Sequence, residues 1–264
     1  MSNSHQGVDV LSEWYSKVLE VLHYILDTQA ESIEKAASII ADAVVKGHVC
    51  FLFGSGHSAI PVMEMFPRYG SFLGFLPIVD LPLVSFLRIV GDMGYPQFDL
   101  IENSPEYGRR IVENYSIHEE DCAVIFSHSG VTPVAVEVAL QFKYRSARVI
   151  GVTSLRHATR AGPRHPKGVK LHEVADVVID TGVPEGDVSI NLTYRGRTLK
   201  VGPLSTVASV FVANALLLKT LSHLLSAGFE PLILPVRGFD PDAEEAMRRV
   251  LRRYREVYSQ HLAR

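Results

Sequence analysis

Residues 50–61 read CFLFGSGHSAIP, an apolar run that breaks into a small, hydroxyl-rich turn and then enters a predicted helix. A second stretch of the same design, AVIFSHSGVTP, occupies residues 123–133. Nearly continuous apolar runs of this length are typical of strands that helices cover on both faces. Each stretch therefore predicts a buried parallel strand whose carboxyl end opens into a polar turn.

The rest of the chain alternates strand and helix patterns. This alternation predicts an α/β fold, a doubly wound parallel sheet in which ligands bind at the carboxyl ends of the strands. Residues 81–104 favour a short helix and an irregular loop, residues 156–168 a basic loop, and residues 188–201 a hairpin. The remaining predicted strands cover 75–79, 148–152 and 176–180, and the remaining predicted helices 59–69, 105–114, 133–144, 205–226 and 241–262.

Residues 8–46 carry apolar side chains at steps of three and four, which indicates one long helix or two joined near residues 28–31. Such an apolar stripe needs to be buried. We expect residues 1–46 to form a helical segment that packs on the domain and on a partner subunit. Residues 47–264 are then the α/β domain.

Composition limits the classes of function. The 264 residues, 47% of them hydrophobic, suffice for one large α/β domain, and a net charge of −3 gives a nucleic-acid partner no electrostatic support. Cys50 and Cys122 lie inside apolar runs, so we expect buried, reduced thiols. The first ten residues do not resemble a signal peptide, and no apolar run reaches the ~18–20 residues that cross a bilayer. We therefore expect a cytoplasmic protein without membrane contact.

The first turn has the residue types that bind an anion. Gly54 and Gly56 let the backbone turn sharply and approach a ligand closely. The helix that follows directs its free amides and the positive end of its dipole at the turn. Ser55 and Ser58 add hydroxyl donors, although serines in these positions also serve simply as helix caps.

The second turn repeats this chemistry with three hydroxyls in six residues. Two such turns at one edge of the sheet predict a site for a phosphate group, whose oxygens accept several hydrogen bonds each. The candidate phosphate ligands of the two turns are Gly54, Ser55, Gly56, Ser58, Ser127, His128, Ser129, Gly130 and Thr132.

A dinucleotide site is the alternative for the first turn. Gly54–Ala59 fits the fingerprint G-x-G-x-x-A, and Asp80 ends the next predicted strand where a ribose-binding acid is expected. A dinucleotide does not explain the second hydroxyl-rich turn. We therefore favour the phosphate site.

At these residues the chain resembles the SIS (sugar isomerase) domain family, which carries G-[SNT]-G-x-S after the first strand and S-x-S-G-x-T after a later one. Gly54–Ser58 and Ser127–Thr132 match these motifs. Residues 164–187 and 201–208 resemble a bacterial SIS-domain group that includes proteins described as phosphoheptose isomerases. Nearly the whole chain shares this resemblance.

The resemblance implies a five-stranded parallel sheet between helices, a homodimer or larger assembly, and a phosphorylated sugar in the cleft. Ser58, Ser127, Ser129 and Thr132 then match the hydroxyls that hold phosphate. Ser205 and Thr206, in the second resembling stretch, are further candidate ligands. The resemblance also implies that a neighbouring subunit completes the site, through the basic loop with Arg164 and His165 or through the N-terminal helices.

An aldose–ketose isomerase moves a proton between two carbons through an enediol, and this reaction requires a base and a proton shuttle. Glu64, on the helix after the first turn, is the candidate base; its alternative role is an ion pair with Arg68 one turn on. His57 and His165 are candidate partners, and His128 is a third. SIS phosphoheptose isomerases carry a His/Glu pair on this helix that the present chain lacks.

No metal or cofactor is expected, because no Cys/His cluster with metal-ligand spacing occurs in the sequence. Three functions stay open. The first is a sugar-phosphate isomerase. The second is a non-catalytic phosphosugar sensor. The third is another SIS chemistry, either cleavage of a sugar ether or deamination of an amino sugar.

Overall fold

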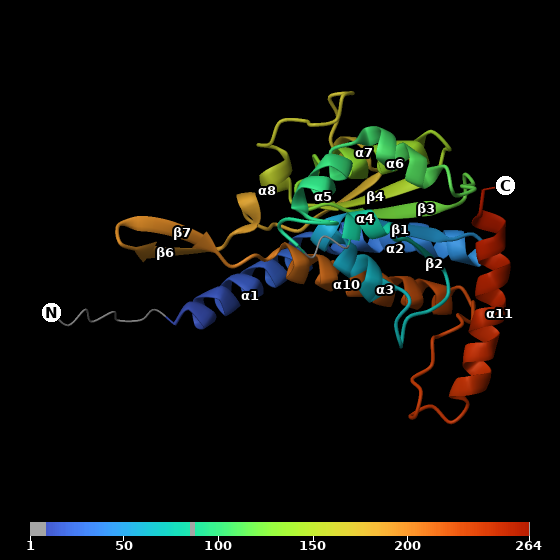
Figure 1. Ribbon diagram of the computed structural model, residues 1–264. Helices are drawn as coiled ribbons and strands as arrows, with labels where there is room; N and C mark the ends of the chain where they lie inside the picture. Colours follow the sequence, from blue (N-terminus) through green and yellow to red (C-terminus); the bar gives the residue numbers. More distant parts are fainter. Residues whose placement is uncertain (1–8, 85–87, 264) are drawn as a thin grey trace.

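A five-stranded parallel sheet lies at the centre of the computed structural model, which describes residues 9–84 and 88–263 (Figure 1). The strand order is β2-β1-β3-β4-β5. This is the doubly wound order of the flavodoxin type, which confirms the predicted fold class. The strands are β1 Cys50–Gly54, β2 Phe75–Ile78, β3 Cys122–Phe126, β4 Arg148–Thr153 and β5 Val177–Asp180.

The direction of connection reverses between β1 and β3. The chain runs from β1 to β2 on one side and then returns across β1 to pair β3 on the other. The register aligns Cys50 with Cys122 and Gly54 with Phe126, so both strands end at the same level. The two hydroxyl-rich turns therefore leave the sheet side by side at the switch point, where ligands bind in this class of fold.

Alternating strand side chains build one core on each face of the sheet. On one face, Leu52 and Val124 pack with the helices α2 and α10; on the other, Phe51 and Ile125 pack with α6 and α7. The helices on the first face are α1 Val10–Thr28, α2 Ala30–Val45, α3 Ile60–Met65 and α10 Ser205–Ser226, and those on the second include α6 Pro105–Val112, α7 Pro133–Lys143 and α9 Leu171–Val174.

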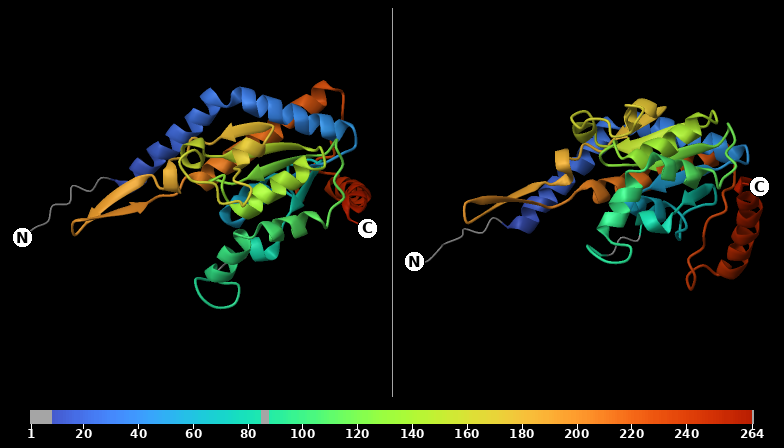
Figure 2. Two further views of the ribbon diagram at one scale, coloured as in Figure 1. Left: turned by 90° about the horizontal axis from the view of Figure 1, so that it is seen from above. Right: turned by 45° about the horizontal axis from the view of Figure 1, so that its top comes forward.

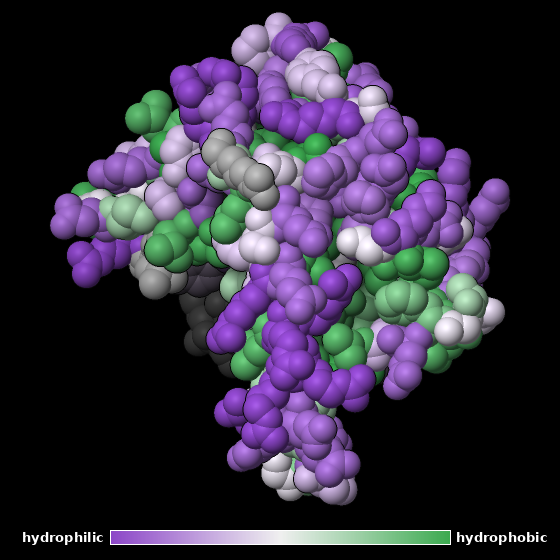
Figure 3. Space-filling model, turned by 90° about the vertical axis from the view of Figure 1, so that its right-hand side faces the viewer, coloured by the Kyte–Doolittle hydropathy of each residue, from purple (hydrophilic) through white to green (hydrophobic). Residues whose placement is uncertain are grey.

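The C-terminal helix α11 (Ala243–His261) covers one edge of the sheet. Val250 joins the core of one face and Val257 the core of the other. Figure 3 shows this side of the molecule, where the hydrophilic residues of α11 form a ridge with hydrophobic residues on both sides. Arginines lie on the solvated face of this helix, since Arg248, Arg252 and Arg255 are exposed.

Helix α1 and the hairpin of β6 (Ile190–Tyr194) and β7 (Arg197–Val201) extend from the same side of the body (Figures 1 and 2). The Trp14 Nε1–H donates to the carbonyl of Pro203 at 3.3 Å, and the Trp14 ring lies against Gly202. These contacts fix the base of the hairpin on α1. The predicted hairpin is confirmed, and of the two alternatives for the N-terminal segment the structure has two helices, joined at Gln29.

Three local predictions need correction. The helix expected at 59–69 is a 3₁₀ turn, η1 Gly56–Ala59, followed by the short α3. The expected loop contains α5 Tyr95–Glu102, because Gly94 begins the helix and Pro96 is tolerated in its first turn. The basic loop contains α8 Leu155–Ala158. The short helix expected after residue 80 is confirmed as α4 Leu81–Val84, and residues 85–87 lie outside the described part.

Helix α10 corrects a fourth expectation. Its 22 residues are long and apolar enough to cross a membrane by length and composition alone, with a mean hydropathy of 1.5. About half of that helix is buried within the fold, where Val212, Leu216 and Leu224 belong to the core. A core helix that packs against α2 and α3 meets the same criteria of length and hydropathy as a membrane-spanning helix.

Both cysteines are buried free thiols, as expected. Cys50 and Cys122 are partners in the register of β1 and β3. Hydrogen bonding with Cys50 and burial both raise the pKa of the Cys122 thiol well above its usual range. The Cys122 thiol is therefore not a reactive nucleophile at neutral pH.

Candidate phosphate site at the switch point

The first turn folds back tightly over the end of β1. The Ser58 amide donates to the carbonyl of Ser55 at 3.0 Å. A β-carbon on Gly54 would lie only 2.0 Å from the Ser58 carbonyl oxygen, so glycine alone fits there. Gly56 has φ +57°, a conformation that also favours glycine.

The side chains of this turn differ in exposure. Ser55 is buried, Ser58 is half-buried and His57 is exposed. The Ser55 hydroxyl donates to Oε1 of Glu102 at 2.6 Å, which links the first turn to the carboxyl end of α5. Ser58 and His57 are thus the members of the turn that a ligand reaches most directly.

The second turn holds its own hydroxyls in place. Oγ of Ser129 lies 3.2 Å from Oγ1 of Thr132, and the Gly130 amide donates to Oγ of Ser127 at 3.3 Å. Gly130 has φ +64°, and a β-carbon there would lie 2.6 Å from Oγ1 of Thr153. The turn therefore rests directly on the end of β4, with Ser129 and Thr132 half-buried at the start of α7.

His128 lies between this turn and the loop that precedes β6. Both of its ring nitrogens are buried and have no hydrogen-bond partner among the described residues. Its ring stands edge-on to His157 at 5.0 Å between centroids. Burial lowers the pKa of His128 to about 4; the charge of Asp187 opposes this shift and His157 adds to it. A neutral imidazole with spare hydrogen-bonding capacity therefore borders the turn.

Glu102 is a carboxyl group of this site that the sequence patterns missed. Burial raises its pKa, while the hydrogen bond from Ser55 and the charge of Arg164 oppose the shift and Asp99 adds to it. The Arg164 guanidinium donates to Oδ1 of Asn103, the next residue along the chain. The carboxyl group of Glu102 at the end of α5, and the Arg164 guanidinium that the basic loop brings to it, thus lie beside the first turn.

Ser205 and Thr206 lie in the first turn of α10, which also contacts η1. Asp187 occupies the end of this helix: its Oδ1 accepts the amides of Leu204 and Ser205, and its Oδ2 accepts the Ser205 hydroxyl at 2.6 Å. The carboxylate of Asp187 therefore caps α10, although Ser205 has the residue type of a helix cap.

Glu64 is engaged in an ion pair. Its Oε1 lies 3.0 Å from Nε of Arg68 and accepts a weaker hydrogen bond from Asn214 of α10 at 3.3 Å. The side chain is 23% exposed. Of the two roles considered for Glu64, the ion pair with Arg68 is present.

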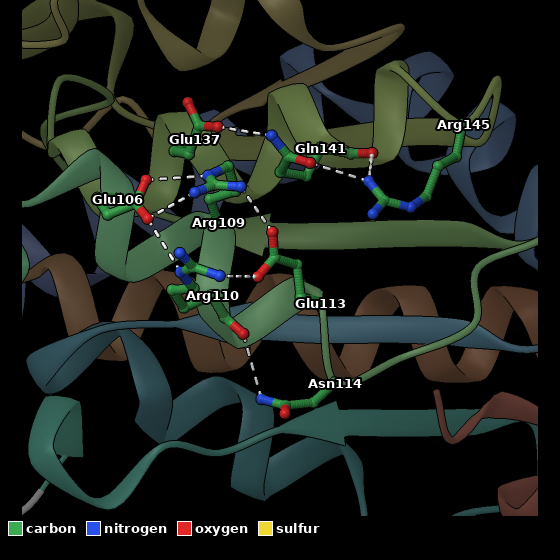
Figure 4. A network of polar contacts seen from close by, with 8 residues as sticks. All are labelled: Glu106, Arg109, Arg110, Glu113, Asn114, Glu137, Gln141 and Arg145. Atoms are coloured by element: carbon green, nitrogen blue, oxygen red, sulfur yellow. Dashed lines mark hydrogen bonds and ion pairs between the residues drawn. The ribbon is translucent and has the colours of Figure 1, made fainter. Parts of the chain in front are cut away.

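His165 is buried behind α7, where its Nε2 lies 2.9 Å from Oε2 of Glu137. Figure 4 shows Glu137 within the polar network between α6 and α7, hydrogen-bonded to Gln141. In the same view Arg109 of α6 pairs with Glu106 and Glu113, and the charge of Glu137 also raises the pKa of its guanidinium. The candidate histidine of the basic loop is therefore paired with α7, whereas Arg164, its neighbour in sequence, lies beside Glu102.

The dinucleotide alternative depends on Asp80. This carboxylate follows β2 and accepts a hydrogen bond from the Tyr107 hydroxyl at 2.8 Å. Burial, and then the carboxylate, raise the pKa of Tyr107 to about 12. Asp80 is thus engaged with α6.

Comparison with known proteins agrees with this geometry. A family model described as SIS domain matches residues 13–154. This chain belongs to the SIS domain family. It is 31% identical over 247 residues to a UPF0309 protein of Geobacillus thermodenitrificans, covering 94% of this chain and 96% of that protein. A UPF0309 protein of Oceanobacillus iheyensis is 33% identical over 218 residues, 83% of this chain and 86% of the relative.

Two solved structures share the fold. A phosphoheptose isomerase of Francisella tularensis superposes with a TM-score of 0.54 at 11% identity, covering 81% of this chain and 97% of that chain. A phosphoheptose isomerase of Neisseria gonorrhoeae gives a TM-score of 0.52 at 15% identity, covering 81% and 98%. At these identities the likeness is one of fold.

Proposed function

We propose that this SIS-domain protein binds a phosphorylated sugar between the two turns and interconverts its aldose and ketose forms. The observation that carries the proposal is the placement of two hydroxyl-rich turns side by side at the switch point of the sheet. Hydroxyls and backbone amides bind a phosphate monoester, and the Arg164 guanidinium lies near enough to add a charge-assisted contact. The sugar carbons then extend toward Glu102 and His128.

We propose Glu102 as the base of this reaction. Its carboxyl group is hydrogen-bonded to Ser55 in the first turn, whereas Glu64 is paired with Arg68. A carboxyl pKa raised toward neutrality suits a group that both takes and returns a proton. A bound phosphate dianion raises this pKa further, because a like charge disfavours the carboxylate. Donors of the turns and the imidazoles of His57 and His128 then stabilise the enediolate and shuttle protons to its oxygens.

Proton exchange between substrate and deuterated water tests this assignment. With a panel of aldose and ketose phosphates, the parent protein should incorporate deuterium at the carbon next to the carbonyl. Glu102→Gln should slow this exchange by at least about 100-fold, the usual share of a general base. Glu64→Gln is the matched control and should retain exchange. The reverse outcome, with exchange lost only in Glu64→Gln, would assign the base to α3.

A phosphosugar sensor without catalysis is the second candidate. The engagement of Glu64 with Arg68 and of His165 with Glu137 favours it, because two of the expected catalytic groups already have partners. If sugar phosphates raise the unfolding temperature of the parent but none exchanges protons, the isomerase proposal fails and the sensor remains. A ligand at 100 times its Kd adds roughly 2.7 kcal/mol to stability, which such a screen detects readily.

We further propose a cytoplasmic homodimer in which α1 and the β6–β7 hairpin contact a second copy. An isolated two-stranded hairpin is marginal in water, and this one exposes Leu199 and Val201. Helix α1 exposes Leu11 and Tyr15 nearby. Light scattering should give twice the chain mass for the parent and one chain mass for Leu11→Asp; a monomeric parent contradicts the proposal.

A further inference from the structure

Three side chains able to bind a metal ion meet at the amino end of the sheet, opposite the candidate phosphate site. His48 precedes β1, Asp121 precedes β3, and His261 ends α11. One nitrogen or oxygen atom of each lies within 4.8 Å of those of the other two. Because 140 residues separate Asp121 from His261, no local sequence motif reveals the cluster.

The spacing of the atoms fits a metal centre. Oδ1 of Asp121 lies 3.3 Å from Nδ1 of His48 and 3.2 Å from Nε2 of His261. Ligands at the usual zinc distance of about 2.0–2.1 Å in a tetrahedral site stand about 3.3 Å from one another. The two distances from Asp121 therefore match those around a shared ion, and the two imidazole nitrogens lie within 4.8 Å of each other.

The tautomer of His261 gives an independent indication. Its Nδ1 lies 2.9 Å from the carbonyl oxygen of Val257, which can only accept, so Nδ1 carries a proton. In the neutral ring, Nε2 then directs a lone pair toward the carboxylate of Asp121. A metal-bound histidine usually donates its other ring N–H to a carbonyl or carboxylate in this way.

Asp121 is also crowded with nitrogen atoms. Its Oδ1 accepts the Val49 amide at 3.1 Å in addition to facing both imidazoles, and its Oδ2 accepts the His118 amide at 2.8 Å. One carboxylate oxygen has about two lone-pair sites for these three nitrogens. A cation held between the carboxylate and the two imidazoles removes this competition.

We propose that His48, Asp121 and His261 bind a divalent transition-metal ion of the zinc class. Two imidazoles and one carboxylate suit zinc better than they suit magnesium or calcium, which prefer oxygen ligands. Asp121 and His261 are almost fully buried, whereas the side chain of His48 is 25% exposed and leaves a route for the ion. The fourth ligand is water or His118, whose ring stands edge-on to those of His48 and His261 at 5.6 and 5.5 Å.

The ion has a structural role in this proposal. Strands β1 and β3 each span five residues, so at about 3.3 Å per residue the cluster lies roughly 16 Å from the two turns. The same region already ties down the end of α11, since the Ser116 amide donates to the His261 carbonyl at 2.8 Å. A bound metal fixes the C-terminal helix to the edge of the sheet and leaves the phosphate site unchanged.

Zinc binding by the full-length protein, prepared without a histidine tag and stripped with a chelator, tests the proposal. Titration with zinc chloride against a chromophoric indicator at neutral pH should give one ion per chain. Cobalt(II) in place of zinc should give the visible absorption of a tetrahedral site. His48→Gln should weaken zinc binding by more than about tenfold. Loss of a residue that merely hydrogen-bonds a metal ligand already weakens binding by about tenfold or more.

His23→Gln is the control, because this histidine is exposed on α1. It should bind zinc as the parent does, and zinc should raise the unfolding temperature of both but not that of His48→Gln. Asp121→Asn, which keeps the shape of the side chain, should also lose the site. Stoichiometric zinc binding by His48→Gln and Asp121→Asn at the parent's affinity, or a parent that takes up no stoichiometric zinc, overturns the proposal.

Discussion

The two ends of the central sheet are built in opposite ways. At the amino end, the carboxylate of Asp121 accepts two backbone amides and faces two imidazoles. At the carboxyl end, Ser129 and Thr132 contact mainly each other, and the His128 ring nitrogens have no partner among the described residues. Buried polar groups are normally satisfied, and in the proposed function the ligand uses the hydrogen-bonding capacity left over at the carboxyl end.

The largest expected effect is at the amino end. Asp121→Ala leaves the Val49 and His118 amides without their acceptor, and each buried donor left unsatisfied costs about 1–3 kcal/mol. Urea unfolding measures the loss. Asp176→Ala is the matched control, because the Asp176 carboxylate accepts one backbone amide, that of Val149, and pairs with the more exposed Lys143 and Arg148; it should cost less. Equal losses of unfolding free energy in the two variants would contradict the larger contribution expected of Asp121.

At the carboxyl end, His128 makes stability depend on pH. Its folded pKa, lowered by burial to about 4, lies below the ordinary 6.5, so the unfolded chain binds the proton more readily. The contribution of neutral His128 to the free energy of unfolding is therefore fully present above pH 6.5. It falls by on the order of 3 kcal/mol as the pH drops toward 4. Asp187 and His157 face this ring, and both residues are present in the parent and in the His128 variant compared below.

Replacing the histidine isolates this effect. His128→Gln keeps a polar side chain but does not titrate, so its unfolding free energy should fall less between pH 6.5 and 4 than that of the parent. Parallel curves for the two proteins would mean that His128 is solvated or has found a hydrogen-bond partner.

Removing one hydroxyl from the second turn should affect ligand binding more than stability. A hydrogen bond to a charged group contributes about 1.5–3 kcal/mol, so Ser129→Ala should weaken sugar-phosphate binding by roughly 10- to 150-fold in calorimetry. Ser259→Ala on α11, where the hydroxyl bonds only the Glu256 carbonyl, is the control and should bind normally. Unchanged affinity in Ser129→Ala would place the phosphate elsewhere.

The smallest expected effect is the change in unfolding temperature on replacing Glu102, and the direction of this change shows whether burial or its partners dominate. Burial raises its folded pKa above the ordinary 4.5, so its favourable contribution is present below that pH and is lost as the pH rises through the folded pKa. Glu102→Gln should therefore unfold at a higher temperature than the parent at pH 7, and this advantage should vanish near pH 4. A variant less stable than the parent at pH 7 would show that the carboxylate is stabilised by Ser55 and Arg164 instead.

The sequence predicted the parts of this molecule that depend on neighbouring residues. The apolar runs of β1 and β3 and the turns after them are local patterns, and the doubly wound parallel sheet followed from the alternation of strands and helices. Helix α5 was missed because Gly91, Gly94 and Pro96 indicate a loop, although a proline is harmless in the first turn of a helix. Glu102 was missed with it, since its contact with Ser55 spans 47 residues.

Side-chain roles were harder to predict where two partners compete. Ser205 has the residue type of a helix cap, but the Asp187 carboxylate accepts two amides and the serine hydroxyl itself. His165 lies in a basic stretch that suggests solvent, yet its ring pairs with Glu137 inside the fold. The cluster of His48, Asp121 and His261 comes together only through tertiary packing.

The close approach at Gly54 has a consequence for variation in this chain. Every other amino acid brings a β-carbon to a point 2.0 Å from the Ser58 carbonyl oxygen, so no replacement at this position is mild. Alanine and serine, harmless at most surface sites, should here displace the whole first turn from the strand that supports it. In a library of random mutants selected for folding alone, position 54 should therefore stay glycine even where Ser58, a proposed phosphate ligand in the same turn, is replaced.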